Sequence, residues 1–276
     1  MTIAPGSMSV GQGLETSFPD IVAGALNIGA DRIKYIQGDT DYLPSGRGSG
    51  GSAATITGGS AVINAAEILI QTGNQIAADV LKCDISDIQY DNGNFYQMND
   101  PDTALDWSEI AQYSNQPDGL DIMGEFTPSA PTYPNGCHIC EVEIDTSTGK
   151  CYVQDYVAVE DVGTALYPVL IEGQILGGIV QGISQALGES LVYDETGQLS
   201  TGSFMDYQMP IASDFPKFRI KTHPVKTKIN PLGAKGVGES GTVGALAATI
   251  SAIQHALVSV GADTIEMPAT PHRIWQ

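Results

Sequence analysis

Apolar residues recur at every third or fourth position between Leu14 and Ile28, which is the spacing of a helix that buries one face. The residues on that face are Leu14, Phe18, Ile21, Val22, Ala25 and Leu26. Asn27-Ile28-Gly29 follows and predicts the end of the helix, because asparagine and glycine commonly terminate helices.

The first part of the chain is predicted to contain further helices and also strands. The predicted helices are 52–70, 75–82 and 107–113. Residues 32–37 alternate as a strand does, and residues 42–51 form a loop rich in glycine, serine and proline. Asp91-Asn92-Gly93-Asn94 lies between apolar flanks, which predicts a β-hairpin over residues 88–98.

The second part again alternates strands with helices. The predicted strands are 140–144, 151–159 and 218–223, and the predicted helices are 171–191 and 241–260. Three prolines within residues 126–136 indicate a boundary, so we expect two halves, 1–127 and 128–276. Because the hairpins favour antiparallel pairing, we predict an α+β fold of two-layer, helix-on-sheet halves and not a doubly wound parallel sheet.

The charge balance limits the partners that the protein can have. Twelve Lys and Arg against 32 Asp and Glu give a net charge of −20 over 276 residues. Such a surface repels phosphate backbones and anionic lipids, so we expect neither nucleic acid nor membrane as a partner. Residues 1–10 lack the regions of a signal peptide, and glycines interrupt the longest apolar stretch at 175–183. We therefore expect a cytoplasmic protein without a transmembrane helix.

The four cysteines leave two interpretations open. Cys137 and Cys140 form a Cys-x-x-Cys pair, which is a pattern of metal and redox sites. However, a structural zinc site needs four ligands, and no second pair has suitable spacing. The pair also lies in a predicted strand, where positions three apart point to opposite faces. Reduced structural cysteines are therefore favoured.

Glycine is over-represented and clustered, with 32 residues against a usual share of about 7%. Residues 46–51 and 236–241 both match Gly-x-Gly-x-x-Gly and both precede a predicted helix. A nicotinamide-binding module would need an apolar strand running directly into the first glycine, and neither segment has one. Two readings remain, namely loops that present backbone N–H groups to an anionic ligand and glycines that only allow helices to pack closely.

One carboxylate stands out in the second glycine segment. Glu239 lies on a turn that is otherwise uncharged beyond Lys235. A carboxylate held in such a turn suits a general base near neutral pH. The alternative is that Glu239 caps the helix that follows.

The same segments together resemble the molybdenum-binding subunit of the xanthine oxidase/aldehyde oxidase family. The resemblance is collinear over essentially the whole chain and includes the tail Met267-Pro268-Ala269-Thr270-Pro271. The other segments that carry it are 11–16, 38–40 with 46–52, 172–174 with 177–182, 204–207 with 209–210, and 231–241. Each motif alone is weak, but their order along the chain is specific.

The resemblance implies a role for each of these segments. It implies a molybdopterin cofactor carrying molybdenum, in the cytosine dinucleotide form usual in bacterial members, and it assigns the catalytic base to Glu239. It assigns cofactor contacts to Gly11, Gln12, Gly13, Thr16, Gly48, Ser49, Gly51, Ser52, Gln181, Lys235, Gly236, Val237 and Gly238. No protein ligand to the metal is implied. The implied reaction hydroxylates an aldehyde or N-heterocycle with water as the oxygen source.

This sequence departs from the family pattern at several positions, and these departures predict which components other chains must supply. Ser52-Ala53-Ala54 stands where the family has Ser-Arg-Ser, so an arginine expected to hold the cytosine end is missing. The substrate-reading residues of the front of the molybdenum subunit are also missing, and four scattered cysteines cannot bind two iron–sulfur clusters. We therefore expect the back half of a split subunit, or a fragment. It would be active with a chain supplying the front half, an iron–sulfur subunit and a flavin (FAD) subunit. The alternative is a non-catalytic assembly or cofactor-handling protein that retains the fold.

Overall fold

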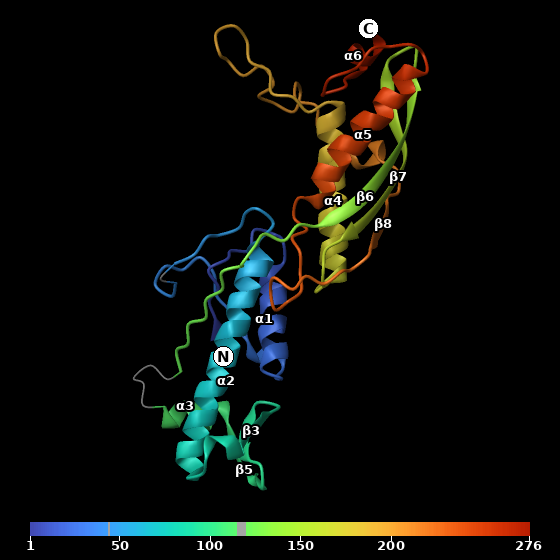
Figure 1. The fold of residues 1–276 in the computed structure, drawn as a ribbon. Helices are drawn as coiled ribbons and strands as arrows, with labels where there is room; N and C mark the ends of the chain where they lie inside the picture. Colours follow the sequence, from blue (N-terminus) through green and yellow to red (C-terminus); the bar gives the residue numbers. More distant parts are fainter. Residues whose placement is uncertain (44, 115–119) are drawn as a thin grey trace. The chain divides into compact units, whose positions relative to one another are not determined.

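The computed structural model describes residues 1–43, 45–114 and 120–276. Pro44, part of the loop predicted at 42–51, lies outside the described residues. The chain forms two compact units, and each is described by itself. Unit 1 comprises Met1–Pro131 together with Lys228–Gly233, and unit 2 comprises Thr132–Thr227 together with Ala234–Gln276. Figure 1 colours the chain from blue at its N-terminus to red at its C-terminus.

Unit 1 begins with a two-residue parallel pairing and a buried helix. Strand β1 (Thr2–Ile3) pairs with β2 (Lys34–Tyr35). Between them lie α1 (Leu14–Ala25) and the 3₁₀ turn η1 (Ala30–Arg32). The predicted helix at 14–28 is therefore confirmed, with its end three residues earlier, because Asn27 adopts a left-handed conformation at φ 46°.

The helices predicted at 52–70 and 75–82 are one helix. α2 (Ala54–Leu81) runs for 28 residues without a break at Gly73. Gly73 lies against the ring of Phe95, where a Cβ would collide with the ring. The residues between the two predicted helices are therefore helical and pack on the hairpin.

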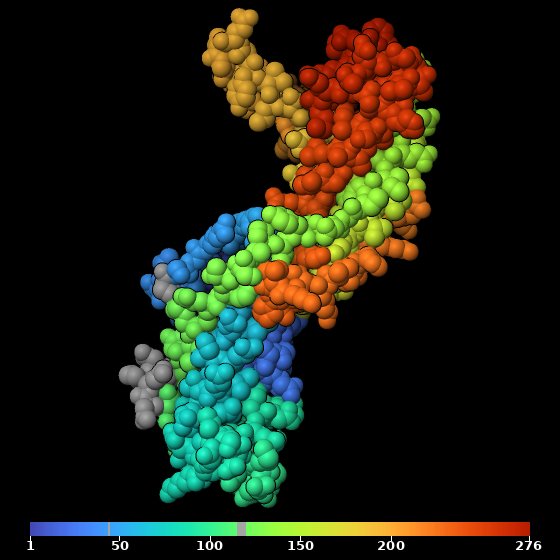
Figure 2. All heavy atoms as spheres, in the orientation of Figure 1, coloured from blue at the N-terminus to red at the C-terminus, as the bar shows by residue number. Residues whose placement is uncertain are grey.

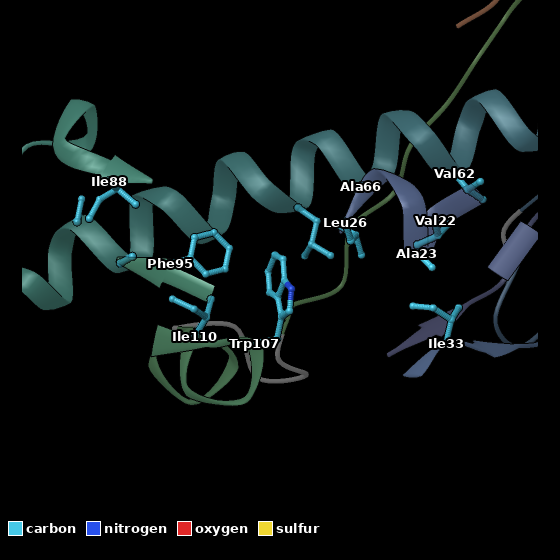
Figure 3. Close-up of a cluster of buried hydrophobic side chains, with 13 residues drawn as sticks. Val22, Ala23, Leu26, Ile33, Val62, Ala66, Ile88, Phe95, Trp107 and Ile110 are labelled. Carbon is cyan, nitrogen blue, oxygen red and sulfur yellow. The ribbon is translucent and has the colours of Figure 1, made fainter. Parts of the chain in front are cut away.

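Unit 1 also contains a three-stranded antiparallel sheet. β3 (Ile88–Asp91) and β4 (Asn94–Gln97) form the predicted hairpin, and β5 (Asp100–Asp106) pairs with β4. The 3₁₀ turn η2 (Ile85–Asp87) precedes the sheet, and α3 (Trp107–Tyr113) follows it as predicted. Figure 3 shows Phe95, Trp107 and Ile110 packed together beside α2 in the core of this unit.

Unit 2 is built on long strands. β6 (Asn135–Asp145) pairs antiparallel with β7 (Lys150–Asp161), as the alternation of apolar residues predicts. β8 (Arg219–Thr222) is parallel to β7 and forms an edge of the sheet. The sequence predicted this strand but not its parallel direction.

The helices of unit 2 pack on this sheet and on one another. α4 (Pro168–Leu187) and α5 (Ser240–Val258) lie in contact, α5 also contacts β6, and α6 (Pro271–Trp275) contacts β7. The 3₁₀ turn η3 (Ala212–Asp214) precedes β8. This helix-on-sheet arrangement confirms the predicted α+β fold.

Glycines set the spacing of α4 and α5. A Cβ on Gly178 would lie 2.9 Å from the backbone nitrogen of Thr242. A Cβ on Gly182 would lie 2.7 Å from both the carbonyl oxygen of Thr242 and the Cβ of Ala245. These distances are too short for any side chain, so the two helix backbones approach each other at glycine positions.

By length and composition alone, α5 is the one helix among residues 1–43, 45–114 and 120–276 that could cross a membrane, with a mean hydropathy of 1.4. Its buried residues include Ala245, Thr249 and Ile253, on a helix that packs on α4 and β6 within unit 2. Within the unit, 28% of that apolar stretch is buried.

We expect Gly182→Ala to destabilise the protein by about 1–3 kcal/mol, because the added methyl group overpacks the contact between α4 and α5. The matched control is Gly177→Ala on the same helix, where a Cβ meets no atom within 4 Å. The control should be neutral or stabilising by up to about 1 kcal/mol, because alanine has the higher helix propensity. Urea unfolding followed by circular dichroism measures both, and equal effects would contradict glycine-limited packing.

Candidate functional site

The first glycine turn in unit 1 leads directly into α1. Gly11 and Gly13 have φ values of 110° and 77°, which L-residues rarely adopt. The carbonyl of Gly13 accepts hydrogen bonds from the backbone nitrogens of Thr16 at 3.2 Å and Ser17 at 3.0 Å, which starts the helix. Gly11 is exposed with no atom within 4 Å of a placed Cβ, whereas Gly13 is buried.

The second glycine loop lies beside the first. The side-chain nitrogen of Gln12 donates to Ser49 Oγ at 2.8 Å and to the carbonyl of Met8 at 3.0 Å. Ser49 Oγ donates to the same Met8 carbonyl. Gln12 therefore joins the turn at residues 11–13 to the loop at residues 48–52 within unit 1.

The loop makes a structural hydrogen bond at Gly48, and there is open space beside several of its glycines. The backbone nitrogen of Gly48 already donates to the carbonyl of Gly6 at 3.2 Å. Gly48, Gly51 and Ser52 have φ values of 70°, 60° and 53°. A Cβ on Gly48, Gly50 or Gly51 would meet no atom within 4 Å, so space beside the loop can receive a ligand.

In unit 2, the turn before α5 is anchored on α4. Gln174 Nε2 donates to the carbonyl of Gly238 at 2.9 Å, and the backbone nitrogen and hydroxyl of Ser240 donate to the carbonyl of Val237 at 3.3 and 3.2 Å. The side chain of Val237 packs against the core of the unit, and Gly236 is buried. The backbone of residues 236–238 is thereby fixed.

Glu239 occupies the N-cap position of α5. Its side chain makes no capping hydrogen bond to the helix, which counts against the interpretation that it serves only as a cap. The residue is exposed in this chain. The partial positive charge of a helix N-terminus lies next to it, which favours an anionic group at this position.

Gln181 lies close to this turn. It is exposed on α4, and its side-chain oxygen accepts a hydrogen bond from Thr242 Oγ1 at 3.3 Å. Thr242 is three residues beyond Glu239, in the first turn of α5. Unit 2 therefore brings Gln181 and residues 236–239 to the same end of the contact between α4 and α5.

The ammonium of Lys235 forms an ion pair within unit 2. Its ammonium lies 2.5 Å from Asp161 Oδ2, and both side chains are 13% exposed. Asp161 also accepts from the backbone nitrogens of Gly163 and Val225, both at 2.9 Å. Partial burial raises the pKa of Asp161, but Lys235 and these two amides together lower it below its ordinary value.

A second polar group is buried in the same unit. His138 Nε2 lies 2.6 Å from Glu160 Oε1, and His138 Nδ1 lies 2.7 Å from Tyr156 Oη. Burial raises the pKa of Tyr156, which keeps its hydroxyl neutral. The imidazole also lies against Gly244 of α5, where a Cβ would come within 2.6 Å of it. The trio therefore supports α5 from the sheet side.

Among the described residues, no group of three or more His, Cys, Asp or Glu side chains is arranged to hold a metal ion. All four cysteines are free, as predicted for reduced structural cysteines. Burial raises the pKa of Cys140 to about 11 and that of Cys151 to about 12, so both thiols stay protonated. Protonated thiols are poor metal ligands.

A dinucleotide-binding site needs a strand that runs directly into its first glycine. The described residues contain no such strand before either glycine segment. β2 ends at Tyr35 and β8 at Thr222, well before Gly46 and Gly236. Neither Gly-x-Gly-x-x-Gly segment therefore follows directly from a strand.

A sequence model of the molybdopterin cofactor-binding domain matches residues 1–216, more than three quarters of the chain. The chain belongs to the molybdopterin cofactor-binding domain family. The resemblance inferred from the glycine segments is thereby confirmed.

Three similar proteins match nearly the whole of this chain. The chain is 35% identical to the carbon monoxide dehydrogenase large chain of Afipia carboxidovorans, over 98% of this chain and 34% of that protein. It is also 35% identical to the nicotine 6-hydroxylase large subunit of Paenarthrobacter nicotinovorans, over 99% of this chain and 35% of that one. The solved structure of quinoline 2-oxidoreductase from Pseudomonas putida 86 matches with a TM-score of 0.85 at 34% identity, covering 99% of this chain and 36% of that one. The chain thus spans about a third of the length of the relatives it matches.

The residues present fit a molybdopterin, which carries phosphate and many ring acceptors. In unit 1, Gln12 holds the turn at 11–13 and the loop at 48–52 together, and open space beside Gly11, Gly48 and Gly51 lets a ligand approach the backbone. In unit 2, the backbone at 236–238 is fixed beside the exposed side chain of Gln181. The ammonium of Lys235 acts differently, because it holds the turn through Asp161.

Sequence reasoning missed Gln174 and Asp161 as individual residues. Gln174 fixes the turn that precedes Glu239, and Asp161 holds Lys235. Asp161 had a readable signal, because an Asp two residues before Gly163 commonly accepts the backbone N–H at that position. Gln174 had none, since 64 residues separate it from Gly238.

We expect Asp161→Asn to destabilise the protein by about 1–3 kcal/mol, because it leaves the ammonium of Lys235 without its charged acceptor. The matched control is Asp155→Asn, whose partner Arg219 is 63% exposed and whose loss should cost less than about 1 kcal/mol.

The stabilisation that Asp161 provides should decrease as the pH falls. Because the pKa of Asp161 is lowered in the folded protein, its contribution is present above the unfolded value of 3.8 and is lost as pH falls toward the lowered one. Urea unfolding from pH 7 to pH 3 measures this, and the variant should lose less stability than wild type below pH 4. Identical pH profiles would show that Asp161 does not hold the turn electrostatically.

Proposed function

We propose that this chain is the molybdopterin-binding part of a molybdenum hydroxylase that oxidises an aldehyde or an N-heterocycle, with water as the source of oxygen. The observation that supports this proposal most is the match over 98–99% of the chain to large subunits of carbon monoxide dehydrogenase and nicotine 6-hydroxylase. Those relatives are about three times as long. We propose that the remaining segments of the subunit carry the residues that recognise the substrate.

The proposed cofactor contacts are the ones assigned from the sequence, apart from Lys235. In unit 1, they are Gly11, Gln12, Gly13, Thr16, Gly48, Ser49, Gly51 and Ser52. The positive φ values and open space at several of these positions suit close approach of a ligand to the backbone. In unit 2, they are Gln181, Gly236, Val237 and Gly238, and Lys235 supports the same turn from behind.

The dinucleotide form of the cofactor is a separate proposal. We propose the cytosine dinucleotide, although Ala53 stands where an arginine is expected. Ala53 immediately precedes the first residue of α2, which is 28 residues long. The N–H groups at the start of that helix can bind a phosphate without an arginine.

The proposed chemistry assigns one task to Glu239. When bound, the cofactor supplies a two-electron acceptor and positions the oxygen that comes from water. The carboxylate of Glu239 accepts the proton of that oxygen nucleophile and so makes it more reactive toward the electrophilic carbon. The hydrogen bonds of Gln174 and Ser240 fix the backbone of the turn from which this carboxylate extends.

The proposed surroundings follow from the same assignment. Electrons leave through an iron–sulfur subunit and a flavin subunit, because the free cysteines of this chain are scattered and two of them stay protonated. The remaining part of the molybdenum subunit covers Glu239, which is exposed in this chain. We propose a cytoplasmic hetero-oligomer.

Metal analysis of the assembled enzyme tests the proposed function. We expect about one molybdenum per copy of this chain, as in other enzymes that use a single metal to activate water. A stoichiometric assembly without molybdenum would contradict the proposal and favour the non-catalytic alternative.

We expect Glu239→Gln to lower kcat by about 10²–10⁴-fold, because the amide cannot accept the proton. Molybdenum content should stay close to that of wild type. The matched control is Glu266→Gln, another exposed carboxylate of unit 2, which should keep full activity. Steady-state kinetics with metal analysis measures both, and full activity of the Glu239 variant would remove this residue from the mechanism.

A further inference from the structure

Residues 189–211 form an arm that projects from unit 2. The arm follows the end of α4, and in Figures 1 and 2 it is the gold segment that extends away from α4 and α5. Its base is closed by Tyr207, whose hydroxyl donates to the carboxylate of Glu189. Gly188 packs against the side chain of Gln208 at the same point. The arm is thus attached at one end by specific contacts.

Hydrogen bonds within the arm give it a defined shape. The backbone nitrogen of Ser200 donates to the carbonyl of Val192 at 2.8 Å, and that of Asp194 donates to the carbonyl of Gln198 at 2.9 Å. A second turn follows, in which Tyr207 N donates to the carbonyl of Ser203 at 2.8 Å. The arm is therefore preorganised, which lowers the entropic cost of docking.

The arm exposes several large apolar side chains to water. Phe204 and Met205, at the second turn, are 81% and 93% exposed. Five further large apolar residues of the arm are exposed, namely Leu191, Val192, Tyr193, Met209 and Ile211. A concentrated apolar surface on an ordered segment marks a site that another surface covers.

The charges of the arm restrict what that surface can be. The arm carries the acidic residues Glu189, Asp194, Glu195 and Asp206, and residues 189–211 contain no Lys, Arg or His. A complementary surface is therefore apolar at its centre and basic at its rim.

We infer that the arm docks onto the part of the molybdenum subunit that this chain lacks, through an apolar surface with a basic rim. The inference rests on the proposed function. The domain match covers residues 1–216 and so includes the arm, which places the arm in proteins about three times as long as this chain. The additional chain in those longer proteins is where we place the surface that covers Phe204 and Met205. The arm holds the subunit together, and it takes no part in the chemistry at Glu239.

Hydrogen–deuterium exchange tests the inference on this chain alone and on the assembled enzyme. Amides of residues 200–211 should exchange at least about tenfold more slowly in the assembly, because docking buries the turn that carries Phe204. Amides of the exposed segment 259–263 should exchange equally in both samples.

The variant Phe204→Ser combined with Met205→Ser should reduce recovery of this chain with the rest of the subunit by at least about tenfold, since exposed aromatic anchors dominate such interfaces. The matched control is Val258→Ser with Val260→Ser, two residues of unit 2 that are 60% and 67% exposed. Both double variants should keep the thermal midpoint of wild type.

Three outcomes would overturn the inference. One is equal exchange of the arm in both samples, and another is normal assembly of the Phe204 and Met205 variant. The third is a doubled mass of this chain alone in light scattering that the same variant abolishes, which would make a second copy the occupant. None of these measurements depends on molybdenum, so failure of the proposed function and failure of this inference are distinguishable.

Discussion

The close contact between α4 and α5 is the constraint on which the geometry of unit 2 depends. Gly178 and Gly182 let the backbone of α5 approach at Thr242 and Ala245, where no side chain fits. Since Glu239 is the N-cap of α5 and the Gly238 carbonyl is bonded to Gln174 on α4, the backbone position of Glu239 follows from that contact. A residue that is set by two packed helices is held more firmly than one on an isolated loop.

The sheet supports the same helix from its other side. His138 lies against Gly244 of α5, and its two ring nitrogens are held by Glu160 and Tyr156. Asp161, next along β7, holds Lys235 at the start of the turn. The imidazole of His138 and the carboxylates of Glu160 and Asp161 thus have partners that position α5 or the segment leading to it, which lowers the cost of burying them.

Unit 1 uses its glycines in two distinct ways. Gly73 lies against Phe95 and Gly59 against Leu232, where a side chain would collide, so these glycines serve packing. Gly11 and Gly51 have positive φ values and open space beside them, so they leave room for a ligand. The packing reading therefore holds at Gly59 and Gly73, whereas ligand contact at Gly11 and Gly51 stays a prediction.

Periodicity and turn chemistry within a few residues were enough to predict most of the long helices and strands, the hairpin at Asn92-Gly93, α3 and the α+β class. The collinear order of its short segments was also enough to place the chain in its family. Contacts made on folding established that α2 is continuous through Gly73 and that Lys235 is paired with Asp161. Such contacts also established that Gln174 anchors the turn before Glu239 and that β8 runs parallel to β7. Each of these depends on residues far apart in the chain, and local pattern does not encode which distant surface will supply a ring, a charge or a hydrogen-bond donor.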